Sequence, residues 1–298
     1  MSLLDPNCWV DTLRQSSHFG AVRRLIGYHS QALRRLYGKR PLPLAYWLSC
    51  RSIIGWFCRS ANPLCLAGTP ARSISASMPV GDLADFLRDD LITGWTLDGE
   101  TITFLWNLLQ QEQPRVIIEC GSGLSTLVFA RGFETYGFGS SNSCSLVSLE
   151  QNLWVKKAVE TRLQACGLEH HVSVMHSRVS RARGEYQLDP NTLRAHLGSE
   201  KADWVVIDGP AGPDGCRAST LPLLAQFCRP GARWFLDDAY RDGELEVLNN
   251  WRGLTGVRVE GIYPIGKGLG VGVVSDPEHV SVSVQAHPGA PSRGHAAA

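Results

Sequence analysis

Three acidic residues directly follow two apolar segments in the second half of the chain. Asp208 comes after residues 203–207, and the pair Asp237 and Asp238 comes after residues 232–236. If both segments are strands of a parallel sheet, the three carboxylates meet at its carboxyl edge, where ligands bind in such sheets. There they could hold Mg²⁺ through oxygen ligands, or Asp208 or Asp238 could accept a proton as a general base.

Carboxylates this close together repel one another, so we expect something to offset their charge. The sequence leaves three possibilities open, which are a divalent cation, a protonated acid, or ion pairs with Arg217 and Arg241. A metal bound by Asp208, Asp237 and Asp238 could orient two substrate oxygens and lower the pKa of a hydroxyl group.

A glycine-containing stretch, residues 119–126 (ECGSGLST), forms a second candidate site. It follows an apolar segment and precedes a helical one, and Gly121 and Gly123 allow a ligand to approach the backbone closely. Thr126 stands where a dinucleotide-binding loop has its third glycine. Glu119 would repel a pyrophosphate but could hold an ammonium group.

The next apolar segment also ends in an acid, Glu150. At this position a carboxylate can accept hydrogen bonds from both hydroxyl groups of a ribose. A ligand with a ribose, a cationic amino-acid portion and no phosphate suits both Glu119 and Glu150, and S-adenosylmethionine is such a ligand. His176, after a third apolar segment, is a further candidate base.

Apolar segments alternate with helical ones from about residue 80. We predict strands at 115–119, 145–149, 171–175, 203–207, 232–236, 256–263 and 268–275. We predict helices at 81–91, 98–112, 124–132, 152–166, 216–228 and 242–251. This alternation predicts a parallel sheet with both faces covered, and the short connection at 264–267 makes the last two strands antiparallel.

These motifs resemble the class I S-adenosylmethionine-dependent methyltransferases. Residues 116–126 resemble the first motif of that family in its G-S-G-x-S-T form, Glu150 the ribose-binding acid, and 203–210 the motif at the fourth strand. The resemblance, which covers about residues 85–275, implies an α/β, Rossmann-like sheet of seven strands, mostly parallel with an antiparallel last strand. The cofactor contacts that it implies are Glu119, Gly121, Ser122, Gly123, Ser125, Glu150, Gln151 and Ser177. Asp208, Asp237 and Asp238 fall where metal-dependent O-methyltransferases carry their ligands.

The composition suggests three regions. Residues 1–80 form a basic, mainly helical accessory region and linker, since residues 1–60 hold nine Lys or Arg and only two acids. Residues 81–275 form the S-adenosylmethionine-binding domain, and 276–298 a disordered tail. The apolar segment 42–58 is interrupted by Arg51, so we expect a buried helix, or else a helix that lies on a membrane surface.

We therefore expect an S-adenosylmethionine-dependent methyltransferase that acts on an oxygen of a small molecule or a glycan sugar. The alternative is a non-catalytic, Rossmann-like ligand-binding or scaffold protein that interacts through the basic N-terminal region. Nucleic acid is disfavoured as substrate, because 208–211 reads Asp-Gly-Pro-Ala rather than an Asn/Asp-Pro-Pro-aromatic pattern. Without a secretory signal or a Cys-x-x-Cys pair, a cytoplasmic protein with reduced cysteines is expected.

Overall fold

The computed structural model describes residues 96–138 and 145–282 of the chain. The predicted helix at 81–91, the apolar segment 42–58, the basic region 1–60 and the end of the tail lie outside the described residues. No helix within the described ranges is long and apolar enough to cross a membrane.

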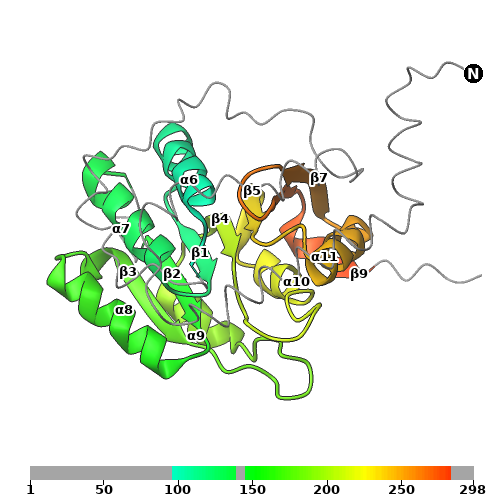
Figure 1. The fold of residues 1–298 in the computed structure, drawn as a ribbon, viewed down its shortest axis with the longest axis horizontal. Coiled ribbons are helices and arrows are strands. Elements are labelled where there is room, and N and C mark those ends of the chain that lie inside the picture. The colour runs from blue at the N-terminus through cyan, green and yellow to red at the C-terminus, as the bar shows by residue number, and fades with distance from the viewer. Residues whose placement is uncertain (1–95, 139–144, 283–298) are drawn as a thin grey trace, which may run out of the picture.

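A seven-stranded sheet forms the centre of the described structure, with the strand order β3-β2-β1-β4-β5-β8-β7 (Figure 1). Its strands are β1 (Ile117–Cys120), β2 (Leu146–Glu150), β3 (Val172–His176), β4 (Ala202–Ile207), β5 (Cys228–Leu236), β7 (Val257–Tyr263) and β8 (Leu269–Val274). Strands β1 to β5 pair in parallel, and β8 runs antiparallel to both of its neighbours. The predicted sheet with an antiparallel last strand is thus confirmed.

Helices cover both faces of this sheet (Figure 1). One face carries α6 (Gly99–Glu112), α7 (Leu124–Tyr136) and α8 (Leu153–Ala165), and the other carries α9 (Pro190–Leu197), α10 (Thr220–Ala225) and α11 (Asp242–Arg252). Successive strand residues alternate between the two cores, with Ile117 in the first and Ile118 in the second. Because both faces are buried, the parallel strands read as continuous apolar runs.

The prediction for two of the helices was wrong. Helix α9 was missed, although Asp189 caps it by accepting hydrogen bonds from the N–H groups of Asn191 and Thr192. The helix predicted at 216–228 spans only Thr220–Ala225, and Cys228 already begins β5. When an apolar run continues from a helix into a strand, its hydrophobic periodicity does not show where the helix ends.

The predicted disordered tail does not begin at Asp276. Residues Pro277–His279 form the short 3₁₀ helix η3, and β9 (Ser281–Val282) pairs antiparallel with β6 (Leu254–Thr255). A strand of two residues is too short to show a hydrophobic pattern, so the sequence could not indicate it. Residues 276–282 therefore belong to the described structure.

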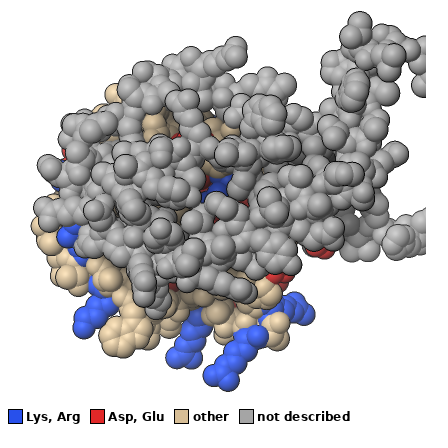
Figure 2. All heavy atoms as spheres, in the orientation of Figure 1, with Lys and Arg blue, Asp and Glu red and all other residues tan. Residues whose placement is uncertain are grey.

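Basic side chains project from the described surface along the lower edge of Figure 2, the side on which α8 and α9 lie in Figure 1. In this view they stand apart from one another rather than forming one continuous patch.

Candidate functional site

The loop after β1 brings the backbone close to the end of β4. Gly121 has a φ of +94°, and a Cβ atom there would lie 3.2 Å from the carbonyl carbon of Asp208. The positive φ and the close approach both favour glycine. Gly123 is extended, with a φ of 176°, and a Cβ atom there would meet no described atom within 4 Å. The backbone at position 123 therefore has room for a Cβ atom on the side from which a ligand could approach.

Glu150 joins this loop to the start of α8. Its Oε2 accepts a hydrogen bond of 3.0 Å from the N–H of Ser122, and its Oε1 one of 2.7 Å from the N–H of Asn152. Burial raises the pKa of Glu150, although these two N–H groups lower it again. Each carboxylate oxygen has a second lone pair, so Glu150 can still accept hydrogen bonds from a ligand.

Glu119 lies buried beneath the same loop. Its Oε2 accepts hydrogen bonds of 2.6 Å from both the Thr126 and Ser148 hydroxyls. Thr126 also accepts a hydrogen bond from the N–H of Gly123, so it links the acid to the loop as a glycine could not. Oε1 of Glu119 has no hydrogen-bond partner among the described residues. Burial raises the pKa of Glu119 to about 7, against the effect of the hydroxyls of Ser125, Ser148 and Thr126.

The other predicted cofactor residues lie at the ends of β2 and β3. The Gln151 side chain pairs with the Ala211 backbone, donating to its carbonyl at 3.0 Å and accepting from its N–H at 2.8 Å. The hydroxyl of Ser177 is buried and has no partner within the described ranges. The eight predicted cofactor residues therefore lie near the carboxyl ends of β1, β2 and β3, with Ser125 in the first turn of α7.

His176 lies apart from the other two candidate bases. It lines a cavity of about 240 Å³ next to the start of α9, and its Nε2 is 3.2 Å from the Gln151 carbonyl oxygen. Asp208 and Asp238 line a different cavity, and β2 and β1 separate β3 from β4. The structure therefore unites Asp208 and Asp238 but does not bring His176 to them.

Asp208, Asp237 and Asp238 meet at the ends of β4 and β5, as predicted. One carboxylate oxygen from each lies within 4.8 Å of the others. Nη2 of Arg217 is 3.3 Å from Oδ1 of Asp208 and 3.9 Å from Oδ2 of Asp238. Arg241 forms an ion pair with Asp238. The two arginines that the sequence offered as counter-ions are therefore both in place.

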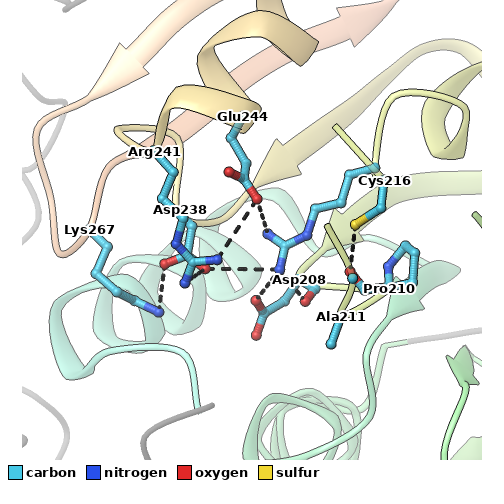
Figure 3. Close-up of a pocket in the computed structure, with 10 residues that line it drawn as sticks. Asp208, Pro210, Ala211, Cys216, Asp238, Arg241, Glu244 and Lys267 are labelled. Carbon is cyan, nitrogen blue, oxygen red and sulfur yellow. Dashed lines mark hydrogen bonds and ion pairs between the residues drawn. The ribbon is translucent and has the colours of Figure 1, made fainter. Parts of the chain in front are cut away.

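Lys267 and Glu244, which the sequence analysis did not single out, complete this acidic cluster. Nζ of Lys267 is 3.0 Å from Oδ2 of Asp237 and 3.0 Å from Oδ1 of Asp238. Oε1 of Glu244 is 3.6 Å from Nη1 of Arg217. Asp208, Glu244 and Lys267 line the same cavity, whose volume is about 320 Å³. Figure 3 shows their side chains around it. Four carboxyl groups thus face three cationic side chains.

Two of the aspartates in this cluster have raised pKa values. Burial raises the pKa of Asp208 to about 6, although Arg217 opposes this. Burial also raises the pKa of Asp237 well above its usual range, against the effect of Lys267.

The position of Lys267 follows from strand order rather than from sequence spacing. Strand β8 is antiparallel to β5 and pairs Gly270 with Leu236, so the β7–β8 connection lies beside the end of β5. The sequence analysis predicted an antiparallel strand pair joined at 264–267. Placing Lys267 at the acidic cluster would also have required knowing that this pair lies next to the fifth strand.

No protein-family model matches this chain, and no curated protein matches it. Among solved structures, it is similar to an O-methyltransferase from Bacillus cereus in complex with SAH, at 16% identity and a TM-score of 0.46, over 76% of this chain and 99% of that one. It is also similar to the O-methyltransferase TomG from Streptomyces achromogenes, in complex with SAM and involved in tomaymycin synthesis. That match has 18% identity and a TM-score of 0.45, over 79% of this chain and 100% of the other.

A methyltransferase from Geobacter sulfurreducens is similar at 19% identity and a TM-score of 0.44, over 75% of this chain and 96% of that one. The fold assignment depends on the strand order described above. Five parallel strands followed by a hairpin whose last strand inserts antiparallel beside β5 give this chain the class I, Rossmann-like methyltransferase fold.

Proposed function

We propose that this protein is an S-adenosylmethionine-dependent methyltransferase that acts on an oxygen atom of a small molecule or a sugar. The observation that carries the proposal is the pair of acids at the ends of β1 and β2. Glu150 is fixed by two backbone N–H groups with lone pairs to spare for a ribose. Glu119, with one buried oxygen that has no partner in the described structure, suits a ligand ammonium group.

The acceptor would occupy the neighbouring cavity at the ends of β4 and β5. When bound, S-adenosylmethionine supplies a methyl group whose bond to sulfur breaks with its electron pair left on sulfur, while an acceptor oxygen forms the new bond to carbon. The proton of the acceptor hydroxyl has to leave. Asp208 is the best-placed recipient, because it lines the cavity and its side chain is 16% exposed, against 2% for Asp238.

The experiment is a transfer assay with S-adenosylmethionine that carries a labelled methyl group. The purified full-length protein is incubated with a panel of catechols, phenols and free sugars, and the product is analysed by mass spectrometry. We expect label on an oxygen of at least one compound class, and Asp208→Asn should lower turnover more than cofactor affinity.

The scaffold alternative predicts a different result in the same assay. A protein that binds S-adenosylmethionine and transfers no label to any compound, with no release of S-adenosylhomocysteine, would favour ligand binding without chemistry. Label on nitrogen rather than oxygen would contradict the proposed acceptor atom while leaving the methyltransferase assignment in place.

A further inference from the structure

Among the three cations of the acidic cluster, Lys267 is the one that contacts the carboxylates of both Asp237 and Asp238. Its Nζ lies 3.0 Å from a carboxylate oxygen of Asp237 and 3.0 Å from one of Asp238. We propose that Lys267 takes the place of a divalent metal ion in this site, so that the protein works without Mg²⁺. The proposed role of Lys267 in turnover rests on the proposed methyltransferase function. The proposal that Lys267 excludes a metal ion does not depend on that function.

The three acids do not fit a metal ion as they stand, because each already faces a cationic side chain. Arg217 contacts Asp208, Arg241 contacts Asp238, and Lys267 contacts both Asp237 and Asp238. A magnesium ion needs near-ideal octahedral oxygen ligands at about 2.0–2.1 Å. It would have to displace the ammonium group from the two oxygens that this group now shares.

The charges of the cluster point the same way. Four carboxyl groups face the guanidinium groups of Arg217 and Arg241 and the ammonium group of Lys267, and Glu244 contacts both arginines. A further double positive charge would lie within a few ångströms of three cations. With all four acids ionised the cluster keeps only one net negative charge, which attracts weakly an ion that gives up its hydration reluctantly.

The backbone around Lys267 is held so that its side chain reaches the cluster. Its N–H donates to Oδ2 of Asp98 at 3.2 Å, and its carbonyl oxygen accepts from the N–H of Tyr240 at 3.3 Å. Gly266 and Gly268 on either side have positive φ values of +51° and +89°. A Cβ atom at Gly268 would lie 2.6 Å from the Tyr240 ring. The connection is thus anchored to α6 and to the turn after β5.

Lys267 also reaches the space in which we place the acceptor. Its side chain is 30% exposed and lines the cavity of about 320 Å³ together with Asp208 (Figure 3). An ammonium group has three N–H donors. Its Nζ is 3.0 Å from one oxygen each of Asp237 and Asp238, and a donor that these two contacts leave over can bind an acceptor oxygen. Lys267 would then stabilise the negative charge that develops on that oxygen as its proton leaves.

The test measures Mn²⁺ binding by electron paramagnetic resonance, with Mn²⁺ as a probe for a magnesium site. We expect no bound Mn²⁺ in the full-length wild type. Lys267→Met removes the charge at similar length and should tighten Mn²⁺ binding by at least about tenfold. Lys267→Arg should remain without bound Mn²⁺, and so should the control Lys201→Met, since Nζ of Lys201 contacts the Gln226 carbonyl oxygen instead.

Two outcomes would overturn the proposal: Mn²⁺ binding in the wild type that Asp237→Asn abolishes, or no gain of binding in Lys267→Met. If Lys267→Met does not fold, as judged by circular dichroism, Lys267→Gln takes its place in the same comparison. Turnover, once an acceptor is known, should be unchanged by chelator. Since Mn²⁺ binding needs no turnover, failure of the proposed function would leave this test intact.

Discussion

At the scale of single residues, Glu150 both organises the site and leaves room for a ligand. Its two hydrogen bonds to the N–H groups of Ser122 and Asn152 set the path of the glycine loop and the start of α8. Because the carboxylate is already fixed, it loses little conformational freedom when a ribose binds to its remaining lone pairs.

Glu150→Gln should weaken S-adenosylmethionine binding. Removing the charge weakens hydrogen bonds to the ribose, each worth roughly 1.5–3 kcal/mol when one partner is charged. We therefore expect an affinity lower by about tenfold to a hundredfold. Calorimetry measures this, with Glu160→Gln on the surface of α8 as the matched control. Equal affinities of the two variants would argue against the ribose assignment.

Glu119 should make the stability of the protein fall as the pH rises. Its folded-state pKa is about 7, above the value of 4.5 for an ordinary glutamate, so the folded protein holds a proton that the unfolded chain has lost. Stability from this group is complete below about pH 4.5 and is lost between there and pH 7, by up to roughly 3 kcal/mol.

Urea denaturation across this pH range checks the expectation against Glu119→Gln, whose side chain does not titrate. The free energy of unfolding of the wild type should fall relative to that of the variant as the pH approaches 7. Parallel curves for the two proteins would show that Glu119 ionises normally.

At the scale of elements, the β7–β8 connection positions Lys267, one of the three cations of the acidic cluster. Its two glycines bracket Lys267, and Gly268 packs directly against the ring of Tyr240. Nothing in the local sequence requires this, because the contact partners come from the turn after β5 and from the start of α6.

Gly268→Ala should destabilise the protein more than Gly231→Ala. Both glycines have positive φ values, +89° and +83°, so both substitutions carry backbone strain of roughly 1–2 kcal/mol. A Cβ atom at 268 also collides with Tyr240, whereas one at 231 meets no described atom within 4 Å. We expect a further loss of about 1–3 kcal/mol at 268 by chemical denaturation. Equal losses would mean that the Tyr240 contact yields easily.

The sequence predicted the parts of the fold and of the site that depend on local pattern. Strands buried on both faces, such as β1 and β4, are continuous apolar runs, and the acids that follow them are read off directly. Lys267 and the Gln151–Ala211 pairing depend on which strands are neighbours, and the sequence order of the strands does not give this. For the same reason, the sequence could not show that His176 lies apart from the acidic cluster.

At the scale of the whole molecule, every residue proposed to contact the cofactor lies between positions 119 and 177. The basic region 1–60 lies outside the described residues, and its role stays a proposal from sequence. We expect that deleting residues 1–60 leaves S-adenosylmethionine affinity unchanged and lowers methyl transfer, provided that the shortened protein remains in solution. Calorimetry and the transfer assay together check this. Full turnover of the shortened protein would show that the region is dispensable for catalysis.

The central claim is that the edge formed by β1 and β2 binds S-adenosylmethionine. It is tested most directly by a calorimetric titration of the wild type and of Gly123→Val. The variant suits this purpose because Gly123 is extended and a Cβ atom there meets no described atom within 4 Å. We predict saturable binding at one site in the wild type, and loss of binding in a variant whose circular dichroism spectrum stays native-like. Absence of binding in the wild type, or equal affinity in both proteins, would contradict the account.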